Sequence, residues 1–130
     1  MMTKTPDRFK RKRAQKRGKN AETLAAWWLR LKGFHIISRS FRRPVGEIDI
    51  IARRGQLLCF VEVKSRAKEA EALAAVTAKQ RSRIAWAARA FLQQRSDLAG
   101  LTMRFDILVI APGRLPRHLK GAWRTEASLA

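Results

Sequence analysis

Acidic side chains, thiols and histidines are all scarce in this sequence. Its 130 residues hold only ten Asp and Glu against 29 Lys and Arg, which gives a formal net charge of +19. That imbalance points to a polyanionic partner, and nucleic acid fits it better than an acidic membrane surface. The single cysteine, Cys59, excludes an internal disulfide and is predicted to pack in the core. Two widely separated histidines, His35 and His118, exclude a zinc site.

Long apolar runs are missing as well. No stretch approaches the roughly 20 residues that a membrane helix needs, and no apolar segment follows the basic start as it would in a secretory signal. A glycine-rich phosphate loop, a Walker motif and internal repeats are not seen either. We therefore expect no membrane partner, and a cytoplasmic location.

The residues that are present suffice for one core. Hydrophobic residues make up 46% of the chain, whose length matches a single domain. Residues 1–19 stand apart, because they carry nine basic side chains and one acid and cannot bury a core. We predict a flexible basic arm over 1–19 that lies along phosphates, and one domain over 20–130. The alternative for 1–19 is a solubilising tail.

A β-hairpin is predicted near the middle of the chain. Two apolar-rich runs, Glu47–Ala52 and Leu57–Lys64, are joined by the short segment 53–56. Side chains alternate along a strand, so the hairpin has one apolar face and one face that carries charged residues. The expected pairs are Ala52 with Leu57, Asp49 with Phe60, and Glu47 with Glu62.

That register brings three of the ten acids and one lysine together. Asp49 would lie diagonal to Glu62, roughly 7 to 8 Å away between backbones, so both carboxylates could hold one cation. The cation would also relieve the like-charge pair of Glu47 and Glu62. Mg²⁺ suits such a site, because it takes oxygen ligands and bridges carboxylates to a phosphate. Lys64 could steer or deprotonate the attacking water, and the group therefore predicts a phosphodiester hydrolase.

Two alternatives remain open for these residues. The charged side chains could form the solvated face of an amphipathic hairpin, with Lys64 paired to Glu62 or Glu47. A one-residue β-bulge, in turn, would send Asp49 to the opposite side of the sheet.

The motifs resemble those of a known family. Gly46-Glu47-Ile48-Asp49 followed by Phe60-Val61-Glu62-Val63-Lys64 resembles the PD-(D/E)XK nuclease superfamily, and within it the YraN-like family of small bacterial proteins. The layout is similar to that of archaeal Holliday junction resolvases, over roughly residues 20–123. The resemblance implies a restriction-endonuclease-like α/β fold, a central mixed sheet of four to five strands flanked by helices. Further matches are Ala21-Glu22, Lys79-Gln80, Arg104-Phe105-Asp106 and His118-Leu119-Lys120.

The resemblance also implies roles for individual residues. Asp49 and Glu62 would bind Mg²⁺ or Mn²⁺, Lys64 would be the catalytic lysine, and Glu22 would be the extra acid on the first helix. Gln80 has two interpretations, a helix cap together with Thr77 or a polar group beside the metal. For Glu22 the alternative is compensation of the helix dipole.

Hydrophobic spacing predicts the remaining elements. A helix over 20–32 would bury a stripe of Leu24, Trp28 and Leu31 that Ala25 widens. The adjacent Trp27 would then lie at the surface or be partly buried under the basic arm. Asp106 is expected to pair with a neighbouring arginine rather than join the acids. The other predicted elements are a strand over 34–41, a short helix or connection over 67–76, a helix from Thr77 with Ile84, Ala88 and Phe91 buried, a strand over 102–110, and a last strand or loop over 114–123.

The sequence thus predicts a divalent-metal-dependent endonuclease within a single nuclease-like domain. DNA is favoured over RNA, branched DNA such as Holliday junctions is a candidate substrate, and a homodimer is expected by analogy. The alternative is a non-catalytic nucleic-acid-binding module that retains the nuclease fold. The residues expected to contact nucleic acid are Arg39, Arg42, Arg43, Arg66 and Arg81, the first three in a basic loop beside Pro44.

Overall fold

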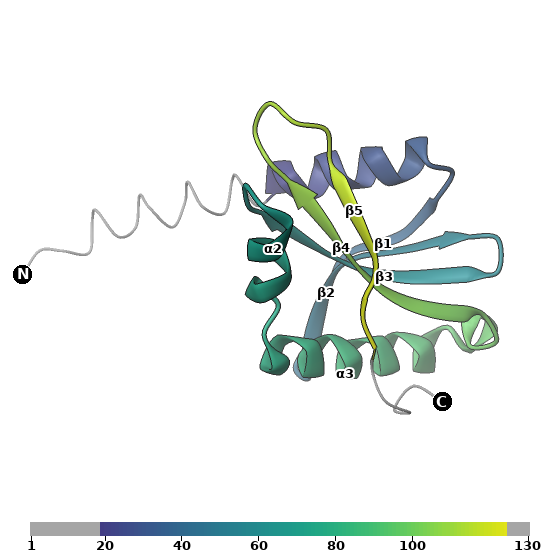
Figure 1. Ribbon diagram of the computed structural model, residues 1–130. Coiled ribbons are helices and arrows are strands. Elements are labelled where there is room, and N and C mark those ends of the chain that lie inside the picture. Colours follow the sequence, from purple (N-terminus) through teal and green to yellow (C-terminus); the bar gives the residue numbers. More distant parts are fainter. Residues whose placement is uncertain (1–18, 125–130) are drawn as a thin grey trace, which may run out of the picture.

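The computed structural model describes residues 19–124, so the arm predicted over 1–19 lies, except for residue 19, outside the described residues. A helix over residues 19–31 precedes a series of strands and helices (Figure 1). These are β1 (His35–Arg43), β2 (Gly46–Arg54), β3 (Leu57–Ser65), α2 (Glu69–Ala75), α3 (Ala78–Gln94), a 3₁₀ turn (Ser96–Leu98), β4 (Thr102–Ile110) and β5 (Arg117–Trp123). No helix within 19–124 is both long and apolar enough to span a bilayer.

The five strands form one sheet in the order β1-β2-β3-β4-β5. Neighbouring strands are antiparallel except for β3 and β4, which are parallel. A parallel pair needs a long crossover, and here α2 and α3 supply it. The mixed five-stranded sheet flanked by helices confirms the predicted fold class and is consistent with a restriction-endonuclease-like fold.

Helices cover both faces of the sheet. Figure 1 shows α3 on one side and the helix over 19–31 on the other. Two separate apolar clusters correspond to these faces, one including Ile84 and Phe91 of α3 and the other including Ala25 and Leu29 of the first helix. Each strand of the sheet centre is therefore buried on both sides, which explains why β2 and β3 are apolar on both faces.

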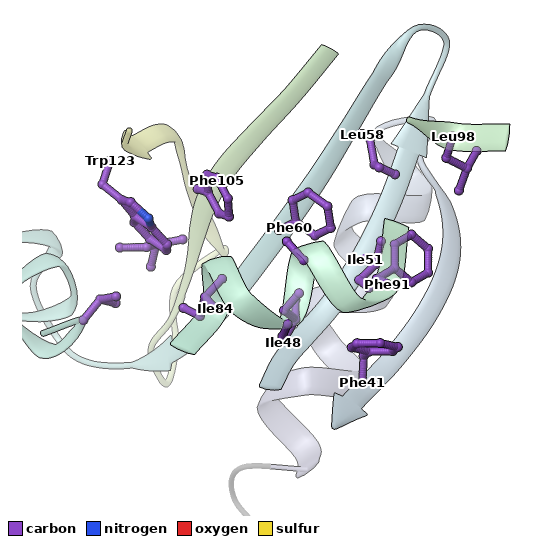
Figure 2. Packing of buried hydrophobic residues seen from close by; sticks show 14 of the residues in the cluster. Phe41, Ile48, Ile51, Leu58, Phe60, Ile84, Phe91, Leu98, Phe105 and Trp123 are labelled. Atoms are coloured by element: carbon purple, nitrogen blue, oxygen red, sulfur yellow. The ribbon is translucent and has the colours of Figure 1, made fainter. Parts of the chain in front are cut away.

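The position of α3 follows from its cap and from one glycine. Thr77 accepts a hydrogen bond from the N–H of Gln80 and starts the helix, and Ile84 and Phe91 are buried as predicted (Figure 2). At Gly46 the backbone of β2 approaches α3 so closely that an added Cβ would lie 1.8 Å from the carbonyl oxygen of Arg83. Only glycine allows this contact, which holds the first turns of α3 against the start of β2.

The predicted core stripe on the first helix was right for Ala25, which is buried, and in part for Trp28, which is half-buried, but wrong for the two leucines. Leu24 and Leu31 are 54% and 78% exposed, and the buried side is made by small residues and Leu29. Alanines at Ala25 and Ala26 let the helix lie close to the sheet, which places the larger side chains of the stripe outside. Trp27 is 59% exposed, as the surface position predicts.

The hairpin register was wrong by two residues. The turn consists of Gly55 and Gln56, with φ of 61° at Gly55, so that Arg54 pairs with Leu57 and Ala52 with Cys59. Glycine adopts this left-handed conformation without strain, which favours a turn at 55–56 over a loop of two or four residues centred one residue earlier.

The basic loop beside Pro44 was also mispredicted. Arg42 and Arg43 are the last residues of β1, where they pair with Glu47 and Gly46. Consequently Glu47 lies at the β1 side of the sheet, where its carboxylate is 3.9 Å from the guanidinium of Arg42, and not opposite Glu62.

Candidate functional site

At Asp49 the regular alternation of side chains between the two faces of β2 is interrupted. Ile48 and Ile51 pack on the α3 side, whereas Ile50 packs under the first helix, so a regular strand cannot run through Asp49. Its Oδ2 accepts a hydrogen bond of 2.8 Å from the backbone N–H of Val63 on β3. The side chain thereby replaces a ladder hydrogen bond, and the carboxyl group is held beside β3.

The Glu62 carboxyl group lies next to Asp49 beneath the first turn of α3. Glu62 is 5% exposed, and the Asp49 carboxyl group lies close enough to raise its pKa. Gln80 Nε2 donates to Glu62 Oε2, and Lys64 Nζ lies 3.6 Å from the same oxygen. The structure therefore brings together four of the predicted site residues, and the solvated-face alternative does not describe Glu62.

Burial and mutual repulsion raise the pKa of both carboxyl groups. Burial and the negative charge of Asp49 raise the pKa of Glu62 from 4.5 to about 8, although Lys64 opposes the shift. The pKa of Asp49 is also raised, mainly by burial, against the opposing hydrogen bond from Val63. At neutral pH the metal-free pair therefore retains a proton.

Gln80 contacts both the helix cap and the carboxyl pair. Its backbone N–H donates 3.2 Å to Thr77 Oγ1 as part of the helix cap, while its side chain reaches the Glu62 carboxyl group. The amide therefore does not close a reciprocal capping box, because it is engaged at the carboxyl pair.

Glu22 lies near the pair of Asp49 and Glu62 but is bonded to other residues. Its charge is close enough to raise the pKa of Asp49, but its carboxylate accepts hydrogen bonds from Arg39 Nε and Ser40 Oγ, each at 3.2 Å. Ser40 has φ of 51° and follows Arg39 on β1. Ser40 was not predicted as a partner of Glu22, because its role depends on this local backbone twist.

Within residues 19–124, no three Asp, Glu, His or Cys side chains are arranged to hold a metal ion together. Asp49 and Glu62 are the pair that could hold a cation, with Glu22 nearby but engaged by Arg39. Such a pair leaves coordination positions for water or substrate oxygens, which suits Mg²⁺.

The predicted nucleic-acid-binding arginines have different environments. Arg42, Arg43 and Arg66 are exposed at the surface, and Arg43 stacks over Phe41 at 4.3 Å. Arg81 instead donates to the carbonyl of Val76 at 3.2 Å and lies over the Trp123 ring. Arg81 is thus engaged within the fold.

A second polar cluster, around Asp106, was only partly anticipated. Asp106 is fully buried and, as predicted, pairs with an arginine: Arg104 donates to both carboxylate oxygens at 2.8 and 2.9 Å. His118 Nε2 lies 2.7 Å from Oδ2, and the N–H of Gly121 donates to Oδ1. Burial alone would raise the pKa of Asp106, but the hydrogen bonds from His118, Arg104 and Gly121 hold it well below its usual range.

Comparisons with known proteins identify relatives across most of the chain. Residues 21–110 match the model of the uncharacterised protein family UPF0102. UPF0102 protein amb4503 of Paramagnetospirillum magneticum is 48% identical over 129 residues, which cover 96% of this chain and 100% of that protein. UPF0102 proteins of Bartonella tribocorum and Nitrobacter winogradskyi are 47% and 53% identical, over 92% and 82% of this chain and 92% and 90% of their own lengths. The names of these relatives state the family and no activity, so chemistry has to be argued from the side chains.

Proposed function

Because this chain belongs to uncharacterised protein family UPF0102, the YraN-like family that its sequence resembles, we propose a function from the geometry of its own residues. The proposal is a divalent-metal-dependent endonuclease that hydrolyses phosphodiester bonds in DNA, with branched DNA as the preferred substrate. The observation that carries it is the pair of half-buried Asp49 and buried Glu62, flanked by Lys64 and Gln80.

The pair fits a hard cation. Two neighbouring carboxyl groups with raised pKa values lack a full counter-charge, because one ammonium, that of Lys64, faces them both. Asp49 and Glu62 would hold Mg²⁺ or Mn²⁺ through oxygen atoms, which both metals prefer. When bound, such an ion supplies Lewis-acid activation of the phosphate and acidifies a water molecule.

Groups beside the pair hold the two carboxyl groups in position and supply positive charge. Lys64 is held at 3.6 Å from Glu62 with its side chain 16% exposed, so its ammonium sits at the rim of the pair, where a phosphate oxygen would approach. Gln80 donates to Glu62 and fixes the orientation of that carboxyl group. Val63 does the same for Asp49 through its backbone N–H. The acids are thus preorganised by α3 and β3.

The charge of the chain supports a nucleic-acid substrate. A formal charge of +19 favours a polyanion, and the exposed Arg42, Arg43 and Arg66 lie on the strands and loop that flank the pair. Arginine suits bidentate contacts with phosphates. DNA and a preference for junctions extend the proposal by analogy with the resolvases that the motifs resemble.

The test compares variants of three acidic residues in the hairpin of β2 and β3. Asp49→Asn and Glu62→Gln should abolish Mn²⁺-dependent cleavage of labelled four-way junctions, while DNA affinity stays equal or increases. Glu47→Gln removes an exposed acid of β2 whose side chain is 58% exposed, and it should leave cleavage unchanged. Lys64→Ala should reduce the rate by about 10²-fold or more with little loss of binding.

Cleavage that survives in both Asp49→Asn and Glu62→Gln would refute the site. Binding of junctions without cleavage in any variant, including the unaltered protein, would instead support the alternative of a non-catalytic nucleic-acid-binding module. Flap, single-stranded and linear duplex substrates in the same assay report the structural preference.

A further inference from the structure

A cluster of cations lies at the far end of the first helix from Glu22. Lys32 directly follows that helix, and ten residues of helix correspond to about 15 Å. Arg54 at the end of β2 and Lys120 in β5 are close enough to Lys32 to lower its pKa. We call Lys32, Arg54 and Lys120 the basic cluster. It is separate from the pair of Asp49 and Glu62.

The buried His118 fixes the position of the Lys32 ammonium. Lys32 Nζ lies 2.6 Å from His118 Nδ1, and an ammonium can only donate. His118 Nδ1 therefore accepts, which leaves the ring hydrogen on Nε2, where it is donated to Asp106 at 2.7 Å. The His118 side chain is 3% exposed, so this relay is rigid, and Lys32 keeps two further N–H donors.

Arg54 is held in place on the other side of Lys32. Its Nη1 donates to the carbonyl oxygen of Lys32 at 3.1 Å, and its guanidinium lies 4.6 Å over the Phe34 ring. The side chain passes Gly33, where an added Cβ would be 3.6 Å from the Arg54 Cδ. The guanidinium is thus stacked and oriented, while the residue is exposed and its remaining donors can reach a ligand.

Among the residues described, the one carboxylate near Lys32 is already bonded to other groups. Around Lys32 the charged neighbours are Lys120, Arg54, Arg104 and one anion, Asp106. Both oxygens of Asp106 are already bonded, to Arg104, His118 and Gly121. Lys120 is exposed and has no hydrogen bond or ion pair with any residue in 19–124. Burial and the repulsion from Lys120 and Arg54 lower the pKa of Lys32, a cost that a bound oxyanion would remove.

We propose that Lys32, Arg54 and Lys120 form a binding subsite for a phosphate group. A planar guanidinium and two ammonium groups supply several N–H donors and the positive charge that the unesterified oxygens of a phosphate require. The phosphate can belong to a nucleic-acid backbone held away from the carboxyl pair, or to a small phosphorylated ligand. Binding at this subsite does not depend on whether the protein cleaves DNA.

The two histidines of the chain make the test direct. In a proton–carbon NMR spectrum at constant pH and ionic strength, the ring signals of His118 report on the Lys32 contact, and His35→Gln assigns them. Inorganic phosphate should shift the His118 signals saturably, with chloride as the matched salt. Lys120→Gln should weaken this affinity about fivefold, the effect of removing one charge near 4 Å in water. The matched control Lys79→Gln, on the exposed start of α3, should not change it.

A second titration identifies the source of the phosphate. Short duplex DNA in EDTA should shift the same His118 signals and compete with inorganic phosphate if the backbone is the ligand. A response to phosphate alone assigns the subsite to a small phosphorylated ligand. The proposal is overturned if the His118 signals do not respond to either probe, or if Lys120→Gln responds like the unaltered protein. Because no cleavage is measured, this outcome is independent of the proposed nuclease activity.

Discussion

The side-chain amide of Gln80 donates a hydrogen bond to Glu62, a carboxyl group that is 5% exposed on the sheet face beneath α3. Gln80 belongs to the first turn of α3, in the crossover between β3 and β4. The contact therefore connects the start of α3 with the pair of Asp49 and Glu62. Four expected outcomes follow from this pair and from the packing around it.

The stability of the metal-free protein should fall as pH rises. The folded state raises the pKa of Glu62 from 4.5 to about 8, so between these values the folded chain binds more protons than the unfolded chain. The free energy of unfolding then decreases by up to about 1.4 kcal/mol per pH unit. Urea unfolding in EDTA from about pH 5 to about pH 8 measures the slope. Glu62→Gln should flatten it, and an equal slope in that variant would show that other groups cause it.

A divalent cation should reverse this loss. Asp49 and Glu62 must be deprotonated to bind a metal, so Mn²⁺ should stabilise the protein more at alkaline than at acidic pH, with proton release. A saturating concentration should raise Tm by on the order of 5 °C above pH 8. Differential scanning calorimetry of the unaltered protein and of Asp49→Asn provides the comparison. An equal rise in Asp49→Asn would place the cation elsewhere.

Removal of the charge at Asp106 should be strongly destabilising. Asp106→Asn leaves Arg104 without its partner next to a fully buried site, at a cost of about 3 to 5 kcal/mol. The matched control is Asp97→Asn, since Asp97 also pairs with an arginine at 3.0 Å, but at the surface. That control should leave the urea midpoint essentially unchanged. Similar midpoints for the two variants would contradict the role assigned to Asp106.

A methyl group at Gly46 should displace α3. The Cβ of Gly46→Ala would meet the carbonyl oxygen of Arg83, and relief of that clash costs about 1 to 3 kcal/mol or more. Gly100→Ala is the control, because a Cβ there has no atom within 4 Å. Because the displacement moves Gln80 away from Glu62, the pH dependence of stability should change in Gly46→Ala as well. Unfolding by urea at two pH values measures both effects.

The sequence was sufficient for the architecture and for the identity of the site residues that meet. The hairpin, the helix from Thr77 and the strand over 102–110 follow from apolar spacing, and Asp49, Glu62, Lys64 and Gln80 converge as the motifs suggested. Apolar spacing left 67–76 open between helix and connection, and 114–123 open between strand and loop. The register was missed because the turn is formed by Gly55 and Gln56, one residue further along the chain than a loop of two or four residues centred within 53–56 would place it. Propensity rules do not specify which of two short turns a glycine will close.

Other errors came from tertiary packing. On the first helix, apolar spacing favoured Leu24 and Leu31, but close approach to the sheet selected Ala25 and Ala26 for the interior. The engagement of Glu22 by Ser40 depends on a positive φ that no pattern indicated. The relay from Lys32 through His118 to Asp106 joins three elements distant in sequence, so only the fold reveals it.

The two-residue turn at Gly55 and Gln56 also affects the order of folding. Asp49 and Glu62 belong to adjacent strands of one hairpin, so the acids can meet early, while water still surrounds them. They become dehydrated only when α3 docks after the longer crossover has closed. Docking of that helix is therefore coupled to uptake of a proton or of a cation, and alkaline, metal-free solution should slow the last step of folding.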